Sequence, residues 1–256
     1  MIHLHKKRYE YLEEINIGVL KQVPGNSAGG ERSVLDVGCG SGALSGAIRK
    51  KGYVVWGVEQ NGEAAETAVG RIDRMITGDL LAFDAIRSEL GTRKFDTLIF
   101  ADVLEHVYDP YSVLLTYLEF LKPGGRLIVS LPNALVWTNR LNFLLGRFEY
   151  ADTGVMDRTH IRFFTFASAK RLVRAVGCSL ERTDYRPFFV RAVLPLMKRL
   201  YWKKAEGRRK IIDSGPYRAY LKWVYPVEYV LGWWWKSLFA FQIILVGIKE
   251  EGVRNA

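Results

Sequence analysis

A glycine-rich stretch, "VLDVGCGSG" at residues 34–42, constrains the fold of this chain more than any other feature. A short apolar run, Val34 to Val37, comes first, and glycines then alternate at positions 38, 40 and 42. Glycine lets backbone N–H groups approach a ligand without interference from a Cβ atom. Residues 43–51 have helical character, so the pattern predicts a strand, a tight turn and a helix whose N-terminus faces the ligand. A turn of this kind suits a nucleotide-like ligand.

Strands and helices alternate along much of the chain. This order implies βαβ units and a parallel sheet. We expect strands over residues 34–37, 53–59, 74–79, 95–102, 126–132, 180–186 and 237–249. We expect helices over residues 3–22, 43–51, 61–70, 110–121 and 166–177, the last capped by Thr165, with a turn at "KPGG", residues 122–125, before the fifth strand.

Length and composition indicate one large α/β domain with insertions. The chain has 256 residues, of which 49% are hydrophobic and 25% charged, as in a globular protein rather than a disordered one. Residues 1–32 are predicted as an N-terminal helix with a lead-in loop, and residues 33–186 as the core with a substrate insertion at 133–164. A basic and aromatic helical insertion at 187–236 precedes the last core strand and tail at 237–256.

The number of cysteines and the length of the apolar segments indicate in which cellular compartment the protein is expected. Cys39 and Cys178 are the two cysteines, which excludes a disulfide framework and a zinc-ligand spacing and fits a reducing cytosol. The N-terminus has no apolar stretch typical of a secretion signal. The most apolar region, residues 223–248, is interrupted by polar residues, so we expect no transmembrane helix. No acidic cluster has the pattern of metal ligands, and we expect no metal site.

The positive charge is unevenly distributed. Of the net charge of +10, the segment 187–236 carries eleven Lys or Arg against three Asp or Glu, a difference of +8. Trp202, Trp223 and Trp233–Trp235 lie among these cations, together with several tyrosines. Such a segment suits an anionic membrane surface at the cytoplasmic face. The same residue types also bind nucleic acid, or form a subdomain with its own aromatic core and a solvated basic face.

A carboxylate, Glu59, follows the second predicted strand about twenty residues after the glycine turn. At that place a carboxylate can accept hydrogen bonds from two ribose hydroxyls. The glycines give G-x-G-x-G rather than the G-x-G-x-x-G of dinucleotide-binding proteins, which disfavours NAD. The glycine turn and Glu59 therefore indicate a nucleotide-like ligand with a ribose, and they disfavour NAD.

Five motifs occur in order: "VLDVGCGSG", "VEQN", "TGDL", "FDTLIFADVLEHVYDP" and "LKPGGRLIVSLPN". Over residues 33–182 the chain resembles the class I S-adenosylmethionine-dependent methyltransferases. The resemblance implies an α/β, Rossmann-like seven-stranded sheet, mostly parallel with the last strand antiparallel and flanked by helices. It also implies S-adenosylmethionine as cofactor and S-adenosylhomocysteine as product.

The resemblance assigns cofactor-binding roles residue by residue. The glycine turn would face the methionine part, with Asp36 orienting the turn or reaching the methionine ammonium, and Glu59 would bind the ribose. Asp79 would accept from the adenine amino group, with Leu80 along the ring. The implied cofactor-binding residues are Asp36, Gly38, Cys39, Gly40, Gly42, Glu59, Gln60, Asp79, Leu80, Ala101, Asp102 and Leu104, the last three on the methionine side. We expect no nucleophilic role for Cys39.

Two histidines are candidates for catalysis. His160, in "MDRTHIRFF", lies in the substrate insertion, where it could act as a base toward a hydroxyl with Asp157 holding its tautomer. Alternatively, His160 ties the insertion to the sheet. His106, in "LEHV", resembles a residue that the family places beside the cofactor, and packing or helix capping is the alternative.

The sequence says less about the acceptor, the molecule that would receive the methyl group. The segments after the fifth strand loosely resemble bacterial methyltransferases of surface polysaccharides and lipopolysaccharide, and relatives with the same core methylate ubiquinone precursors. We therefore expect O-methylation of a sugar hydroxyl in a glycan or lipid-linked saccharide. The alternative is O-methylation of a quinone-like or other small molecule. RNA ribose methylation and cofactor binding without catalysis are less favoured.

Overall fold

The computed structural model describes residues 15–25, 30–187 and 219–251. Its contacts divide these residues into two compact units. The first unit comprises residues 15–101, 111–129 and 248–251, and the second comprises residues 102–110, 130–187 and 219–247, apart from the undescribed stretches.

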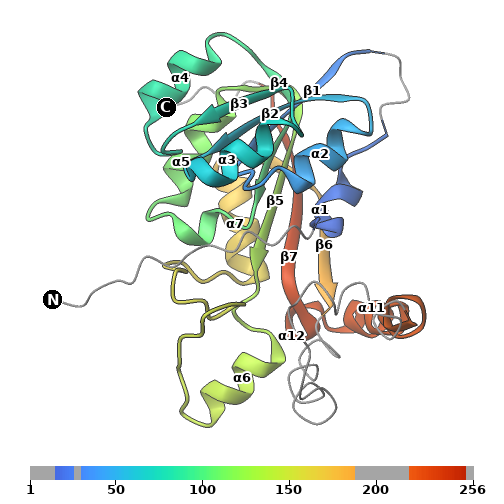
Figure 1. Cartoon of the computed structure of the whole chain (residues 1–256). Helices are drawn as coiled ribbons and strands as arrows, with labels where there is room; N and C mark the ends of the chain where they lie inside the picture. Colours follow the sequence, from blue (N-terminus) through green and yellow to red (C-terminus); the bar gives the residue numbers. More distant parts are fainter. Residues whose placement is uncertain (1–14, 26–29, 188–218, 252–256) are drawn as a thin grey trace, which may run out of the picture. The chain divides into compact units, whose positions relative to one another are not determined.

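Seven strands form one mixed sheet with antiparallel pairing at the end of the chain, which confirms the expected fold class (Figure 1). Their order is β3-β2-β1-β4-β5-β7-β6. The strands are β1 (Arg32–Val37), β2 (Tyr53–Glu59), β3 (Arg74–Thr77), β4 (Phe95–Ala101), β5 (Leu121–Pro132), β6 (Cys178–Pro187) and β7 (Ala240–Lys249).

The first unit contains the parallel part of the sheet. β1 pairs in parallel with β2 and with β4, so that Asp36 lies opposite Gly57 on one side and Ile99 on the other. Val34 and Leu35 are buried, as are Thr97 and Leu98 opposite them on β4. A parallel strand that is covered on both faces is buried along its length, and it is therefore mostly apolar. The helices of this unit are α1 (Ile17–Gln22), α2 (Ala43–Arg49), α3 (Gly62–Val69), α4 (Phe83–Leu90) and α5 (Pro110–Leu118), the first residue of α5 belonging to the second unit. α2 and α3 pack beside β2 and β3 (Figure 1).

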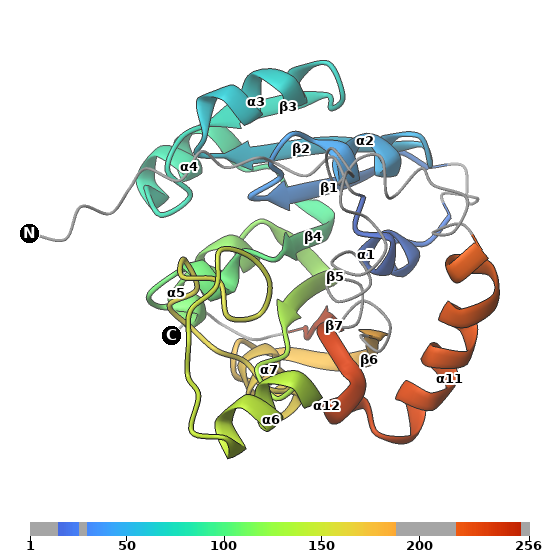
Figure 2. The same cartoon turned by 60° about the horizontal axis from the view of Figure 1, so that its bottom comes forward.

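The second unit combines residues 133–164, the predicted substrate insertion, with the last strands. Its helices are η1 (Leu104–His106), α6 (Trp137–Leu144), α7 (Phe166–Ala175), η2 (Tyr220–Val224), α11 (Tyr225–Trp234) and α12 (Lys236–Phe239). Thr165 caps α7 as expected, in a reciprocal capping box with Ser168. α11 leads through α12 into β7 (Figure 2). The described part of the predicted basic insertion, residues 219–236, is mostly helical, and its residues 187–218 lie almost wholly outside the described residues.

Three elements differ from expectation. The predicted turn at 122–125 is part of β5, which begins at Leu121 and accommodates Gly124 at a φ of 69°. α4 was not predicted, although its buried residues Ile86 and Leu90 are four positions apart, as on one face of a helix. The insertion at 133–164 contains α6, where no helix was predicted. The first part of the predicted helix at 3–22 lies outside the described residues, and α1 begins after its N-cap Asn16.

Candidate cofactor and acceptor sites

The glycine turn has the backbone that its sequence predicts. Gly38, Gly40 and Gly42 have φ values of 72°, 54° and 74°, in the left-handed region that favours glycine. A Cβ atom on Gly42 would lie 3.0 Å from the Cβ of Ala68 on α3. The turn therefore needs glycine both for its conformation and for the close approach of a neighbouring helix.

Glu59 holds this turn from the end of β2. Its Oε2 accepts a hydrogen bond from the Gly40 N–H at 2.8 Å, and its Oε1 accepts from the Asn61 N–H at 2.9 Å. The side chain is buried. The ribose contact of Glu59 stays a prediction.

Asp36, at the end of β1, keeps one oxygen without a partner. Ser45 donates to its Oδ2, whereas its Oδ1 is buried and has no hydrogen-bond partner among the described residues. Burial raises the pKa of Asp36 to about 7, with a further rise from the nearby Glu59 and an opposing effect of the Ser45 hydrogen bond. A buried carboxylate oxygen without a donor is costly, so this atom suits a cationic ligand group.

The Cys39 side chain packs under the turn. Its Sγ would lie 2.6 Å from a Cβ atom on Gly57, which explains glycine at that position of β2. Burial raises the pKa of the Cys39 thiol, which agrees with a packing role. The Cys39 backbone N–H donates to the Val58 carbonyl at 3.1 Å, and the next predicted residue, Gln60, has an exposed side chain.

Asp79 and Leu80 follow β3 in the first unit. Asp79 is exposed, and its Oδ1 accepts from the Leu81 N–H at 2.9 Å in a local turn. The Leu80 side chain is buried, and its carbonyl accepts from the Tyr117 hydroxyl at 2.9 Å. This bond fixes the backbone beside the residue predicted to contact the adenine ring.

The remaining predicted cofactor residues follow β4. Ala101 ends that strand in the first unit, and Asp102 and Leu104 begin the second. Asp102 has a φ of 58°, and its carboxylate accepts from Gln242 Nε2 at 2.6 and 2.7 Å and from Ser130 Oγ at 3.1 Å. Leu104 is fully buried in η1. Their cofactor contacts stay predictions.

His160 is buried in the second unit and oriented by a backbone group. Its Nδ1 lies 3.0 Å from the Val155 carbonyl oxygen, which can only accept, so Nδ1 is the protonated nitrogen. Nε2 then carries the lone pair of the neutral ring. Asp157 was expected to hold the tautomer of His160, but its Oδ1 accepts from the N–H and Oγ1 of Thr159 at 2.9 and 2.8 Å. Val155 therefore performs the orienting role predicted for Asp157.

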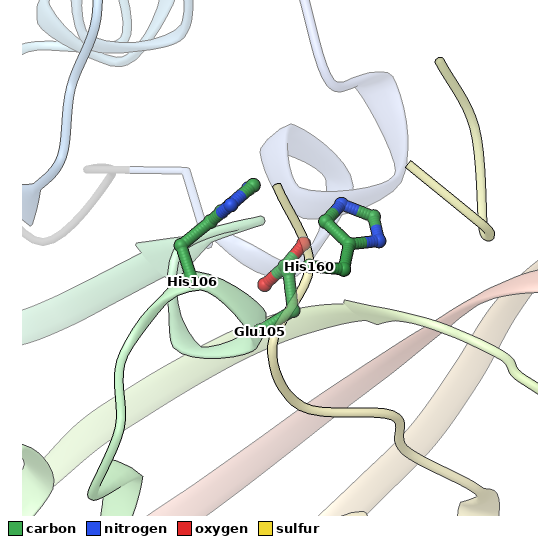
Figure 3. Close-up of side chains that lie close together, drawn as sticks. All are labelled: Glu105, His106 and His160. Atoms are coloured by element: carbon green, nitrogen blue, oxygen red, sulfur yellow. The ribbon is translucent and has the colours of Figure 1, made fainter. Parts of the chain in front are cut away.

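His106 lies against His160 and is oriented in the same way. Its Nδ1 donates to the Thr159 carbonyl at 3.1 Å, and the two imidazole centroids are 4.8 Å apart at 70°. Burial and the neighbouring His160 lower the pKa of His106. Glu105, which sequence reasoning missed, completes the group (Figure 3). Its place beside His106 in "LEHV" was visible, but its proximity to His160, fifty-five positions later, was not.

An exposed aromatic cluster lies in the substrate insertion. Phe143 stacks on Phe148 with centroids 5.5 Å apart, and Phe148 also contacts Tyr150 and Phe163 at 5.7 and 6.3 Å. All four side chains are exposed. Exposed clustered rings of this kind are typical of surfaces that bind apolar or planar partners.

Residues 5–183 match a family model described as "Methyltransferase domain". The match covers more than half of the chain, which therefore belongs to this methyltransferase family. The predicted family, enzyme class and S-adenosylmethionine dependence are confirmed at this level.

Curated relatives match over part of their length. A ubiquinone biosynthesis O-methyltransferase of Histophilus somni is 36% identical over 111 residues, which cover 40% of this chain and 46% of the relative. A protein of the same name from Pseudomonas putida is 32% identical over 132 residues, covering 50% and 56%. The chain thus spans about half the length of these relatives.

Solved structures share the fold at low identity. A SAM-dependent methyltransferase of Archaeoglobus fulgidus has a TM-score of 0.54 at 17% identity, covering 86% of this chain and 87% of that one. The magnesium protoporphyrin IX methyltransferase of Synechocystis, solved with SAH bound, has a TM-score of 0.50 at 18% identity, covering 86% and 75%.

Proposed function

We propose that this protein transfers the methyl group of S-adenosylmethionine to a hydroxyl of a small, quinone-like aromatic acceptor. The observation that carries the acceptor class is the match to ubiquinone biosynthesis O-methyltransferases at 32–36% identity. The sugar acceptor expected first from the sequence has no counterpart among these relatives and stays a prediction. The aromatic alternative has the better support.

The first unit fits the cofactor. Asp36 Oδ1, buried without a partner among the described residues, suits the methionine ammonium, and Glu59 lies against the glycine turn at the end of β2, where we assign the ribose. Bound there, the sulfonium supplies an activated methyl group. The task of the chain is then to hold the acceptor oxygen within about 3 to 3.5 Å of that methyl and to exclude water.

The second unit fits an aromatic acceptor. The cluster of Phe143, Phe148, Tyr150 and Phe163 offers exposed ring faces and edges to a planar molecule. The histidines add polar groups, because the Nε2 lone pairs of His106 and His160 are left for a proton or a cation. Activation of the acceptor hydroxyl is the role that we assign to this pair.

We also propose that α11 docks on an anionic membrane surface. Tyr185 stacks on Tyr229 with centroids 4.9 Å apart and fixes one side of the helix to β6. Residues spaced as on one helical face, Trp223, Val227, Val230 and Trp234, are exposed. Lys222 lies over the Trp223 ring, and Lys236 follows on α12, over the Tyr185 ring. Tryptophan and lysine are typical of the membrane–water interface, and an apolar quinone precursor would be met there. No helix among the described residues has the length and apolar character needed to cross a bilayer.

The test is an assay of methyl transfer with several acceptor classes. Purified protein would be incubated with radiolabelled S-adenosylmethionine and a polyhydroxylated benzoate, a polyprenylated catechol, a lipid-linked saccharide or RNA. We expect label in the catechols. Transfer to the saccharide alone would restore the glycan acceptor, and cofactor binding without transfer to any acceptor would contradict the proposal.

A further inference from the structure

Three potential metal ligands converge in the second unit from two separate segments. Glu105 and His106 lie on η1, and His160 comes from the substrate insertion (Figure 3). One potential ligand atom from each residue lies within 4.8 Å of the others. Backbone hydrogen bonds join the two segments, because the Glu105 carbonyl accepts from the N–H groups of Ile161 and Arg162 at 2.9 and 3.0 Å.

Both imidazoles are held as metal-binding histidines are held. Each Nδ1–H donates to a backbone carbonyl, that of Thr159 for His106 and that of Val155 for His160. This arrangement fixes the tautomer, aims the ring and leaves Nε2 as the free donor of an electron pair. A histidine that merely packed in a core would not need a second histidine oriented in the same way beside it.

Glu105 supplies an independent observation. Its side chain is 1% exposed, and its Oε2 has no hydrogen-bond partner among the described residues. A buried carboxylate oxygen without a partner carries the full cost of its lost hydration. A cation bound beside it would remove that cost.

We propose that Glu105, His106 and His160 bind a divalent transition-metal cation. Two imidazoles and one carboxylate favour zinc, cobalt, manganese or iron over magnesium and calcium, which prefer oxygen ligands. Bonds of about 2.0 to 2.2 Å place two ligands of one cation at most about 4.4 Å apart. The ligand atoms lie within 4.8 Å of one another, so metal binding requires the side chains to move together by a few tenths of an ångström, and the exposed His106 is the least confined of the three.

Three protein ligands leave coordination positions open, as in catalytic rather than structural metal sites. An oxygen of water, or of the acceptor hydroxyl, fits such a position, and a bound cation lowers the pKa of that hydroxyl. This second step rests on the proposed function. The cation site itself does not.

The test measures binding of the metal alone. A background chain with His3→Ala and His5→Ala removes the other two histidines of the sequence. After chelator treatment it would be titrated with Co²⁺ and Zn²⁺ by absorption spectroscopy and calorimetry, without cofactor or acceptor. We expect one cation per chain, with imidazole and carboxylate coordination. No binding, or a sulfur-to-cobalt band from Cys39 or Cys178, would overturn the site.

Variants locate the site. On the same background, Glu105→Gln and His160→Gln should each weaken binding by more than about tenfold, whereas Glu63→Gln, an exposed residue of α3, should not change it. Thermal melts establish that each variant is folded, and His160→Gln keeps a donor for the Val155 carbonyl. Equal affinity in the cluster variants would overturn the proposal. Metal binding without methyl transfer to any acceptor would contradict only the proposed function.

Discussion

Glu59 holds Gly40 through a hydrogen bond of 2.8 Å between its Oε2 and the backbone nitrogen, nineteen positions earlier in the chain. The residue at the end of β2 therefore shapes the turn at the end of β1. A single carboxylate links the conformation of the glycine turn to the predicted ribose contact, so the two roles can be separated only by measuring stability and affinity together.

Glu59→Gln should weaken the turn and the cofactor site. The amide keeps one acceptor oxygen but places an N–H₂ group against either the Gly40 or the Asn61 N–H. Because hydrogen bonds to charged groups contribute about 1.5 to 3 kcal/mol, we expect S-adenosylhomocysteine affinity to fall by roughly tenfold or more in calorimetry. Glu63→Gln on exposed α3 is the control. Unchanged affinity would refute the ribose assignment.

Gly42→Ala should destabilise the turn. A non-glycine residue in the left-handed region costs about 1 to 2 kcal/mol, and the added Cβ would lie 3.0 Å from Ala68 Cβ. Denaturant unfolding should show a loss of at least that size. Gly62→Ala, where a Cβ meets nothing within 4 Å, should leave the free energy of unfolding unchanged or slightly raised. Equal effects of the two substitutions would contradict this reading.

Asp36 should make cofactor binding depend on pH near neutrality. Burial raises its pKa to about 7, so the residue is protonated below that value and anionic above it. If the carboxylate pairs with the methionine ammonium, affinity for S-adenosylhomocysteine rises with pH through about 7 in calorimetric titrations. Asp36→Asn should remove this dependence, and a pH profile shared by both proteins would exclude the pairing.

The raised pKa of Asp36 also makes the free energy of unfolding depend on pH. This stability falls as the pH rises, whereas cofactor affinity rises. A pKa above the ordinary value of 3.8 means that the folded state binds the proton more tightly than the unfolded state does. The contribution of Asp36 to the free energy of unfolding is therefore largest at acid pH and decreases as the pH rises from about 4 to about 7. Urea unfolding of the wild type and Asp36→Asn across this interval measures the difference, which should shrink at low pH.

Tyr117→Phe should disturb the predicted adenine contact through the backbone. The Tyr117 hydroxyl donates to the buried Leu80 carbonyl at 2.9 Å. Its loss leaves that acceptor without this bond and should cost about 1 to 3 kcal/mol of unfolding free energy, with weaker cofactor binding. Tyr108→Phe, on a 78% exposed side chain, serves as the control. A stability loss without any change in affinity would confine Tyr117 to a packing role.

Trp234→Ala together with Val230→Ser should reduce sedimentation with anionic vesicles several-fold. Both side chains lie on the exposed face of α11, and Trp234 is 82% exposed. Added salt should weaken binding further, because Lys222 and Lys236 act electrostatically. Leu144→Ala, an exposed apolar change on α6, should bind as the wild type does. Unaltered binding of the double variant would remove α11 from the membrane contact.

Local patterns predicted a large part of this fold. The glycine turn, the parallel strands β1 to β4 and the Thr165 cap of α7 follow from neighbouring residues, because turn conformation, strand period and helix capping are short-range effects. The order of motifs was also enough for the family, since five motifs in sequence are far more specific than one.

Tertiary structure decided what depends on distant residues. The sequence alone determined a strand, a glycine turn and a carboxylate after β2, whereas only folding turned that carboxylate toward Gly40. Folding of the whole chain likewise placed β7 between β5 and β6, and it brought Glu105 and His106 together with His160. The physical reason is that chain direction and side-chain packing, which no local pattern encodes, determine which polar atoms meet. For that reason Val155 rather than Asp157 orients His160.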